Sequence, residues 1–172
     1  MPIQRLNHAV LYVRDVAASA TFYRDVLGFR PVMQIPGQAV FLQAEGSTND
    51  HDLGLFHLGP QAGPSGAGRT TVGLYHLAWE VDTLGELARV RDALAAAGAL
   101  GGASDHGTTK ALYARDPDGI EFEVSWLVPA DQLSGGEHDN PTIAPLDLDA
   151  EIARYGADRA GGVGVSHAAA AG

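Results

Sequence analysis

LNHAVLYV at residues 6–13 and LYHLAWEV at residues 74–81 decide the fold of this chain. Each stretch has a histidine in third place, His8 or His76, followed by apolar residues typical of a β-strand. The two histidines lie 68 residues apart (76 − 8). A repeat of this length predicts that one structural unit occurs twice in the chain.

The sequence after the first stretch predicts one helix and three further strands. Asp15 stands at the expected N-cap of the helix, apolar residues follow at helical spacing, and Gly28 ends the run. The turns Pro36-Gly37 and EGSTND separate the strands that follow. The strands of this first unit are expected at residues 4–13, 30–35, 38–44 and 52–58.

The same order of elements is predicted after the second stretch. Thr83 and Glu86 form a capping-box pattern, and Gly98 follows the helix that they begin. The turn Asp116-Pro117-Asp118-Gly119 leads into the last strand and is expected to set its register. The strands of this second unit are expected at residues 74–81, 100–103, 110–115 and 120–126.

These patterns predict an α+β fold in which two βαβββ modules pair into a curved mixed sheet around a central metal cavity. One module alone would leave a sheet face bare, and pairing two modules covers it. A Gly/Pro/Ser-rich stretch separates the modules, and a polar extension with one short helix at 147–155 follows them. The expected boundaries are 1–58 for the first module, 59–70 for the linker, 71–128 for the second module and 129–172 for a partly flexible C-terminal extension.

Composition narrows the classes of function. The net charge is −10, and the 11 lysines and arginines are scattered, which argues against binding to nucleic acid or to an anionic membrane. The chain has no cysteine, so disulfides and thiolate metal sites are excluded. The N-terminal residues do not resemble a signal peptide, and a cytoplasmic location is expected.

Three residues are candidate metal ligands because they lie at corresponding strand positions with apolar neighbours: His8, His76 and Glu123. A carboxylate among apolar residues is costly to bury unless a positive charge compensates it. Two imidazoles and one carboxylate form the facial triad typical of non-haem Fe(II) oxygenases, and a related set could hold Mn, Ni or Zn. Taken singly, each residue could equally be an ordinary strand or surface residue.

His57 is a possible fourth ligand. It lies 66 residues before Glu123 (123 − 57), and the repeat makes it the expected counterpart of Glu123 in the first unit.

The chain resembles the glyoxalase/bleomycin-resistance/extradiol-dioxygenase group, also called vicinal oxygen chelate, over roughly residues 4–128. The resemblance rests on LNHAVLYV, FYRDVLGF, LYHLAWEV and above all SDHGTTKALYARDPDGIEFEVSW, which is most similar to small extradiol (catechol 2,3-type) dioxygenases. It departs from that pattern at Ile120, where the family often has Asn, and in having two modules rather than four.

The resemblance implies a metal site formed by His8, His76 and Glu123, with Fe(II) as the metal. It also implies that His51 is an acid–base residue, that Tyr113 donates a hydrogen bond to the substrate, and that His106 is a further active-site residue. The implied reaction is cleavage of a catechol-like ring by O2 in aromatic catabolism, with both reactants brought together on the metal. His51 suits proton transfer because the ordinary pKa of histidine lies near working pH.

Two alternatives remain open from the sequence. One is a glyoxalase-like isomerase or epimerase with four ligands, His57 included, on Ni, Co or Zn. The other is a non-catalytic small-molecule-binding protein of the same fold. The partners expected for a ring-cleaving dioxygenase are a catechol-like substrate, O2 and a second copy of the chain in a homodimer. Lys110 and Arg115 are the candidate cations for a substrate carboxylate.

Overall fold

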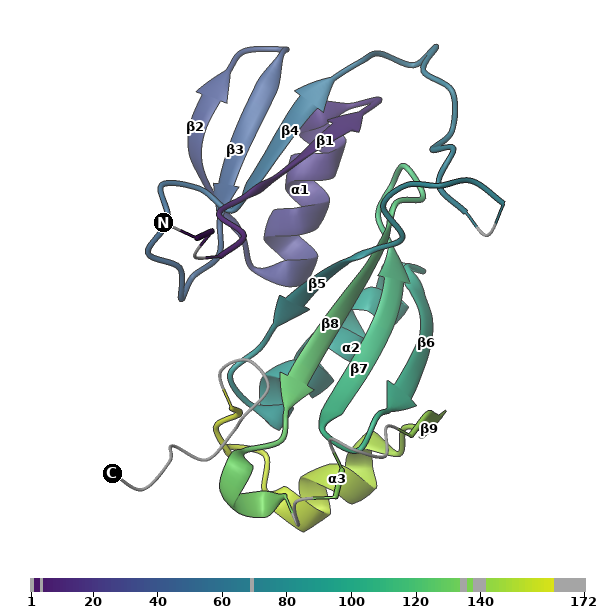
Figure 1. Ribbon diagram of the computed structural model, residues 1–172. Helices are drawn as coiled ribbons and strands as arrows, with labels where there is room; N and C mark the ends of the chain where they lie inside the picture. The colour runs from purple at the N-terminus through teal and green to yellow at the C-terminus, as the bar shows by residue number, and fades with distance from the viewer. Residues whose placement is uncertain (1, 4, 69, 134–135, 138–141, 163–172) are drawn as a thin grey trace. The chain divides into compact units, whose positions relative to one another are not determined.

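The structure is a computed structural model that describes residues 2–3, 5–68, 70–133, 136–137 and 142–162. It divides into two compact units, which we call unit 1 and unit 2. Unit 1 is Met1–Gly66 with Asp116–Ile120, and unit 2 is Ala67–Arg115 with Glu121–Gly172. The helices and strands of both units are labelled in Figure 1.

Unit 1 contains one helix and a four-stranded sheet in the order β1-β4-β3-β2. Strand β1 runs parallel to β4, and the other neighbours are antiparallel. The elements are β1 (Ala9–Val13), α1 (Val16–Leu27), β2 (Arg30–Ile35), β3 (Ala39–Gln43) and β4 (Leu53–His57).

Helix α1 begins and ends where the sequence predicts. The Asp15 carboxylate accepts hydrogen bonds from the amides of Ala17 and Ala18 at 2.9 and 3.1 Å, which satisfies donors that the first turn leaves free. Gly28 ends the helix with φ 79°, a left-handed conformation that glycine adopts without steric cost.

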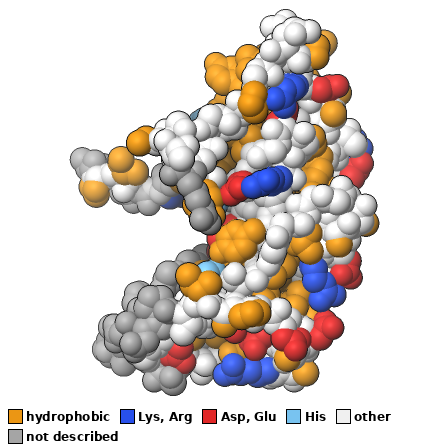
Figure 2. Space-filling view, turned by 90° about the vertical axis from the view of Figure 1, so that its right-hand side faces the viewer, with side chains coloured by type: hydrophobic (Ala, Val, Ile, Leu, Met, Phe, Trp, Pro, Cys, Tyr) orange, Lys and Arg blue, Asp and Glu red, His pale blue; other side chains and the backbone are white. Residues whose placement is uncertain are grey.

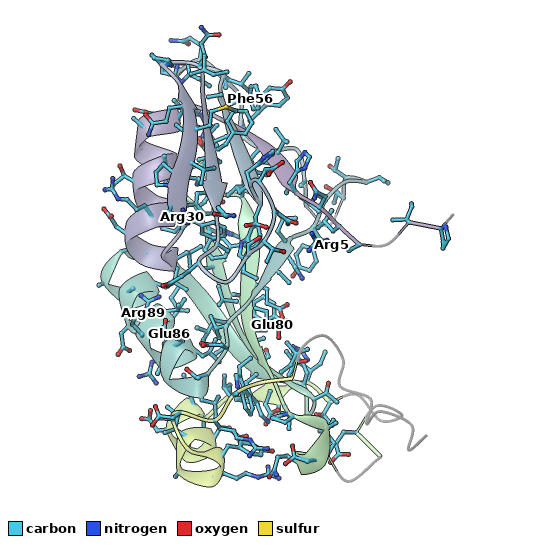
Figure 3. All side chains as sticks on the ribbon, turned by 90° about the vertical axis from the view of Figure 1, so that its left-hand side faces the viewer. Arg5, Arg30, Phe56, Glu80, Glu86 and Arg89 are labelled. Atoms are coloured by element: carbon cyan, nitrogen blue, oxygen red, sulfur yellow. The ribbon has the colours of Figure 1, made fainter. Side chains whose placement is uncertain are left out.

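The two faces of the unit 1 sheet differ because side chains alternate along each strand. Leu11, Leu53 and Leu55 are buried on the face that α1 covers. Phe56, labelled in Figure 3, alternates with them and belongs to the opposite face. That opposite face also carries Val10 and Tyr12, which are 50% and 68% exposed.

Unit 2 repeats this arrangement, with its five-stranded sheet ordered β5-β8-β7-β6-β9. Strand β5 is parallel to β8, as β1 is to β4. The predicted α+β fold with two βαβββ modules is therefore confirmed. The elements are β5 (Leu77–Glu80), α2 (Leu84–Ala96), β6 (Leu100–Asp105), β7 (Thr109–Arg115), β8 (Glu121–Leu127) and β9 (Ala144–Pro145).

Helix α2 covers one face of the unit 2 sheet. Thr83 caps it by accepting a hydrogen bond from the Glu86 amide at 3.2 Å. Figure 3 shows Glu86 and Arg89 of α2 on one side of this sheet and Glu80 of β5 on the other. The apolar residues buried between α2 and the sheet are Leu84, Leu87, Val90, Leu94, Phe122, Val124 and Trp126.

The described part of the C-terminal extension packs onto unit 2. It contains the 3-10 turn Ala130–Gln132, β9 and the helix α3 (Leu148–Tyr155), which contacts α2. The predicted helix at 147–155 is thus confirmed, whereas β9 is too short to leave a periodic pattern. The indole of Trp126 donates a hydrogen bond to the Arg159 carbonyl at 3.2 Å.

The turn between β7 and β8 belongs to unit 1 rather than to the unit that contains both strands. The Tyr23 hydroxyl donates to Asp116 at 3.2 Å, and the Arg14 guanidinium pairs with Asp118 at 2.6 Å. Burial raises the pKa of Asp116, and it raises that of Tyr23 well above its usual value, with the Asp116 charge adding to the effect. This turn therefore does more than set the register of β8.

The surface gives two further observations. None of the described helices is long and apolar enough to span a bilayer. On the face drawn in Figure 2, the basic side chains of the described residues are interspersed with acidic ones.

Candidate active site

The candidate site residues of unit 2 lie on the sheet face opposite to α2. His76 directly precedes β5, and not within it as the sequence predicted, because β5 begins at Leu77. Ala78 of β5 is paired with Glu123 of β8, so His76, two residues earlier, shares this face. Nε2 of His76 lies 3.4 Å from Oε2 of Glu123, and the two side chains are 26% and 13% exposed.

Tyr113 joins this pair from the other side of β8. It stands directly opposite Glu123 in the β7–β8 ladder, and its ring centroid lies 6.0 Å from that of His76. Burial raises the pKa of Tyr113, and the neighbouring Glu123 carboxylate raises it further. The phenol is therefore protonated at neutral pH and can exchange hydrogen bonds with a bound molecule.

His106 completes the cluster in unit 2. It follows β6 at a tight turn that contains Gly107, and it is partly buried. Nε2 of His106 lies 2.8 Å from the Tyr113 hydroxyl. The four residues of this unit that the sequence singled out, His76, His106, Tyr113 and Glu123, thus form one contiguous group, which we call the unit 2 cluster.

Unit 1 brings its own two candidates together. His8 directly precedes β1, and its ring centroid lies 4.5 Å from that of His51. Nδ1 of His8 lies 2.7 Å from Oδ1 of Asn7. Because an amide oxygen only accepts, Nδ1 carries the hydrogen, and Nε2 keeps its lone pair for a metal or a donor. Phe41 also contacts the His51 ring in an edge-on arrangement, at 5.1 Å between centroids.

Asn49 explains why these two segments lie side by side. Its side-chain amide donates to the Asn7 carbonyl and to the Asp52 carboxylate, each at 2.7 Å. It therefore ties the residues before β1 to the loop that carries His51. The sequence predicts no role for Asn49, since a polar residue in a turn has no distinctive spacing.

The predicted metal triad is divided between the units: His8 belongs to unit 1, and His76 and Glu123 to unit 2. Within either unit, the described residues include no group of three His, Asp or Glu side chains arranged to hold a metal. The His76 and Glu123 donors nevertheless fit a shared ion. Two donors about 2.0–2.2 Å from one metal, at right angles, would lie about 3 Å apart, close to the observed 3.4 Å. Nδ1 of His76 is buried without a hydrogen-bond partner among the described atoms.

The structure contradicts the predicted equivalence of His57 and Glu123. Ala9 pairs with Leu53 in unit 1, and Leu77 pairs with Phe122 in unit 2. Ala9 directly follows His8, and Leu77 directly follows His76. Leu53 therefore corresponds to Phe122, and the counterpart of Glu123 is Gly54. His57 is the counterpart of Trp126 instead, three positions further on.

The strand face also separates His57 from Glu123. His57 is paired with Val13, which is buried on the α1 side of its sheet, whereas Glu123 lies on the face away from α2. The error arose because a spacing of 66 was matched by residue type rather than by the ladder register. His57 is an exposed residue at the end of β4.

The candidate substrate cations are occupied elsewhere. Lys110 is 2% exposed and pairs with Asp105 at 2.6 Å and Glu151 at 3.0 Å. It points to the α2 side of the sheet, because its ladder partner is Trp126. Arg115 pairs with Glu121 at 2.5 Å on the surface. His138 and His167, for which the sequence predicts no role, lie outside the described residues.

Comparisons with known proteins identify the family. A model of the Glyoxalase/Bleomycin resistance protein/Dioxygenase superfamily matches residues 5–124. Biphenyl-2,3-diol 1,2-dioxygenase 3 of Rhodococcus globerulus is 35% identical over 153 residues, which cover 82% of this chain and 76% of that protein.

Solved structures agree with this family. Lactoylglutathione lyase from Agrobacterium tumefaciens is 26% identical, with a TM-score of 0.54 over 73% of this chain and 95% of that one. A glyoxylase/bleomycin resistance protein/dioxygenase domain from Frankia sp. EAN1pec has a TM-score of 0.62 over 81% of this chain and 100% of that one. At 21% identity, the second likeness shows the fold alone.

Proposed function

Because the chain belongs to the glyoxalase/bleomycin resistance protein/dioxygenase superfamily, we propose that it is an extradiol-type dioxygenase that cleaves a catechol-like ring with O2. The observation that carries the proposal is the unit 2 cluster, in which two metal-ligand types adjoin a tyrosine–histidine pair. The relative named as a biphenyl-2,3-diol dioxygenase supports the same choice and suggests an aromatic diol as the substrate class.

The residues proposed to hold the metal are His8, His76 and Glu123. His8 presents a free Nε2, and His76 and Glu123 present donors at a separation that suits adjacent ligands. Two imidazoles and one carboxylate match the ligand set of non-haem Fe(II) oxygenases. The chemistry that Fe(II) supplies in such a set is Lewis-acid polarisation of the diol and electron exchange with O2.

His51 is the proposed acid–base residue. Its ring lies beside His8 at 4.5 Å between centroids, so a group that gives or takes a proton stands next to a proposed ligand. Phe41 contacts the same ring edge-on at 5.1 Å between centroids. A histidine in this position can accept a diol proton and return it to the oxygen that develops as the ring opens.

Tyr113 and His106 are proposed to contact the substrate from unit 2. Tyr113 lies between Glu123 and His106, so its hydroxyl can hold a substrate oxygen in a fixed orientation. The product would carry one new carboxylate and one new carbonyl, one oxygen atom of O2 going to each.

A glyoxalase-like isomerase is the competing function, and the likeness to lactoylglutathione lyase favours it. An isomerase of this kind needs a fourth protein ligand. The register of the strands shows that His57 does not occupy the position in unit 1 that corresponds to Glu123. Gly54 occupies that position and has no ligating side chain. The dioxygenase is therefore the better-supported function.

The deciding experiment compares both activities in one preparation. Metal-free protein is loaded anaerobically with Fe(II) and assayed for O2 uptake with catechol and biphenyl-2,3-diol. The same protein is loaded with Ni or Zn and assayed for isomerisation of a hemithioacetal. We expect O2 uptake with a diol and no isomerisation. Isomerisation without O2 uptake would establish the competing function. The expected homodimer stays a prediction, to be measured by light scattering of the same sample.

A further inference from the structure

The His106 ring has a partner at each nitrogen. Nδ1 lies 3.2 Å from the backbone carbonyl oxygen of Thr142, and Nε2 lies 2.8 Å from the Tyr113 hydroxyl. A carbonyl oxygen only accepts hydrogen bonds, so Nδ1 must be the donor to Thr142. In the neutral ring Nε2 then carries no hydrogen and acts as an acceptor. The Nε2 lone pair then faces the Tyr113 hydroxyl, for which the Glu123 carboxylate is a second hydrogen-bond acceptor.

The segment that contains Thr142 is fixed on unit 2 by backbone pairing. Strand β9, two residues further on, continues the sheet: Ala144 pairs with Asp105 and Pro145 with Ser104. The paired residue Asp105 is the immediate neighbour of His106. The edge of β6 thus holds the Thr142 carbonyl close to the turn that presents the imidazole.

A buried charge network holds the same region from the other face of the sheet. Lys110 pairs with Asp105 at 2.6 Å and with Glu151 of α3 at 3.0 Å. Asp105 also accepts a hydrogen bond from the Gly107 amide at 2.8 Å, within the His106 turn. One buried ammonium therefore connects the turn to α3. Breaking such a buried pair is costly, because it leaves an uncompensated charge.

We propose that the segment from Thr142 to Glu151 is a positioning element that fixes His106 in its Nδ1–H tautomer. The role of this segment in turnover rests on the proposed function. Its contacts with His106 do not depend on that function. Fixing this tautomer leaves Nε2 of His106 as an acceptor that competes with the Glu123 carboxylate for the single proton of the Tyr113 hydroxyl.

The test reads the tautomer of His106 directly in metal-free protein. Histidine is labelled with nitrogen-15, His106 is assigned by its absence in His106→Gln, and spectra are recorded above the ordinary histidine pKa of about 6.5. We expect protonation on Nδ1 alone. Replacing Ile143 by its α-hydroxy acid turns the Thr142–Ile143 peptide into an ester, whose carbonyl is a weaker acceptor. The tautomer ratio should shift about 2- to 10-fold towards Nε2–H, the effect of weakening one neutral hydrogen bond.

Two controls separate this role from a general loss of structure. The α-hydroxy acid at Val72, an exposed position of the same unit, should leave the ratio unchanged. Glu151→Gln should shift the ratio, whereas Asp149→Asn on the same helix should not. An Nε2–H tautomer or a doubly protonated ring in the wild-type protein would overturn the proposal, as would an unchanged ratio in the ester variant. Lack of O2 uptake would count against the proposed function alone.

Discussion

Nε2 of His76 and Oε2 of Glu123 lie 3.4 Å apart on the face of the unit 2 sheet that α2 does not cover. His76 directly precedes β5, and Glu123 lies on β8. The parallel pairing of these two strands sets the separation of the two side chains. The contact makes Glu123 the residue whose loss should affect metal binding most directly.

Glu123→Ala should therefore weaken metal binding by at least about 100-fold, since the loss of even an outer-shell partner costs about 10- to 100-fold. Metal content after anaerobic loading with Fe(II) measures the effect. Glu121→Ala is the matched control: Glu121 lies two residues earlier on β8 and pairs with Arg115 at the surface. Equal metal content in Glu123→Ala and the wild-type protein would remove Glu123 from the site.

His51→Ala should keep metal and substrate binding and lose turnover by about 10²- to 10⁴-fold, the usual cost of removing an acid–base group. Steady-state O2 uptake and a substrate titration under anaerobic conditions separate the two effects. A variant with near wild-type turnover would show that His51 only packs against His8 and Phe41.

His57→Ala should change neither metal content nor turnover. His57 is exposed and lies on the helix-covered side of its sheet, whereas Glu123 lies on the side of its sheet that faces away from the helix. This variant distinguishes the two candidate functions. A protein that loses its metal on this substitution would have His57 as a ligand, as the glyoxalase-like reading requires.

The sequence could indicate most residues of the unit 2 cluster. What it could not indicate has a physical reason. The members of the cluster, His76, His106, Tyr113 and Glu123, could be named as candidates because strand patterns and a family resemblance indicate their places. His57 was misassigned because it was matched to Glu123 by residue type at a spacing of 66, whereas the ladder register gives 68 positions from Ala9 to Leu77 and 69 from Leu53 to Phe122. A spacing count cannot detect that difference, whereas hydrogen-bond register does.

Contacts through backbone atoms were not predictable in the same way. The partner of His106 is the carbonyl of Thr142, and every residue has a carbonyl, so no residue type marks it. The burial of Lys110 was missed for a related reason. A lysine in a strand usually faces water, and only the distant Glu151 and the neighbouring Asp105 make its burial possible.

Gly161→Ala should destabilise the docking of the extension on unit 2. A β-carbon at this position would lie 2.9 Å from the Trp126 indole nitrogen and 3.0 Å from the Leu127 carbonyl oxygen, so the indole or the neighbouring backbone must shift. Overpacking of this kind costs about 1–3 kcal/mol. Urea unfolding measures the change, with Gly73→Ala as the control, since a β-carbon there meets no atom within 4 Å. Equal stability of the two variants would contradict the described packing.

Asp105 should make stability depend on pH in acid. Burial alone would raise the pKa of Asp105, but hydrogen bonds from the Lys110 ammonium and the Gly107 amide outweigh it and lower the pKa. The contribution of Asp105 is therefore complete above its unfolded pKa of about 3.9 and is lost as the pH falls through the lower folded value. Urea midpoints measured downward from about pH 5 should fall more steeply for the wild-type protein than for Asp105→Asn. Parallel curves would show that the Lys110 pair does not contribute.

The origin of the product oxygens tests the dioxygenase proposal most directly. Fe(II)-loaded protein is given a catechol under oxygen-18 gas, and the ring-opened product is analysed by mass spectrometry before its carbonyl oxygen exchanges with water. The account predicts that both new oxygen atoms come from O2, with the label retained in the carboxylate after the carbonyl has exchanged. A product whose new carboxylate oxygen comes from water instead, and therefore carries no label, would contradict it.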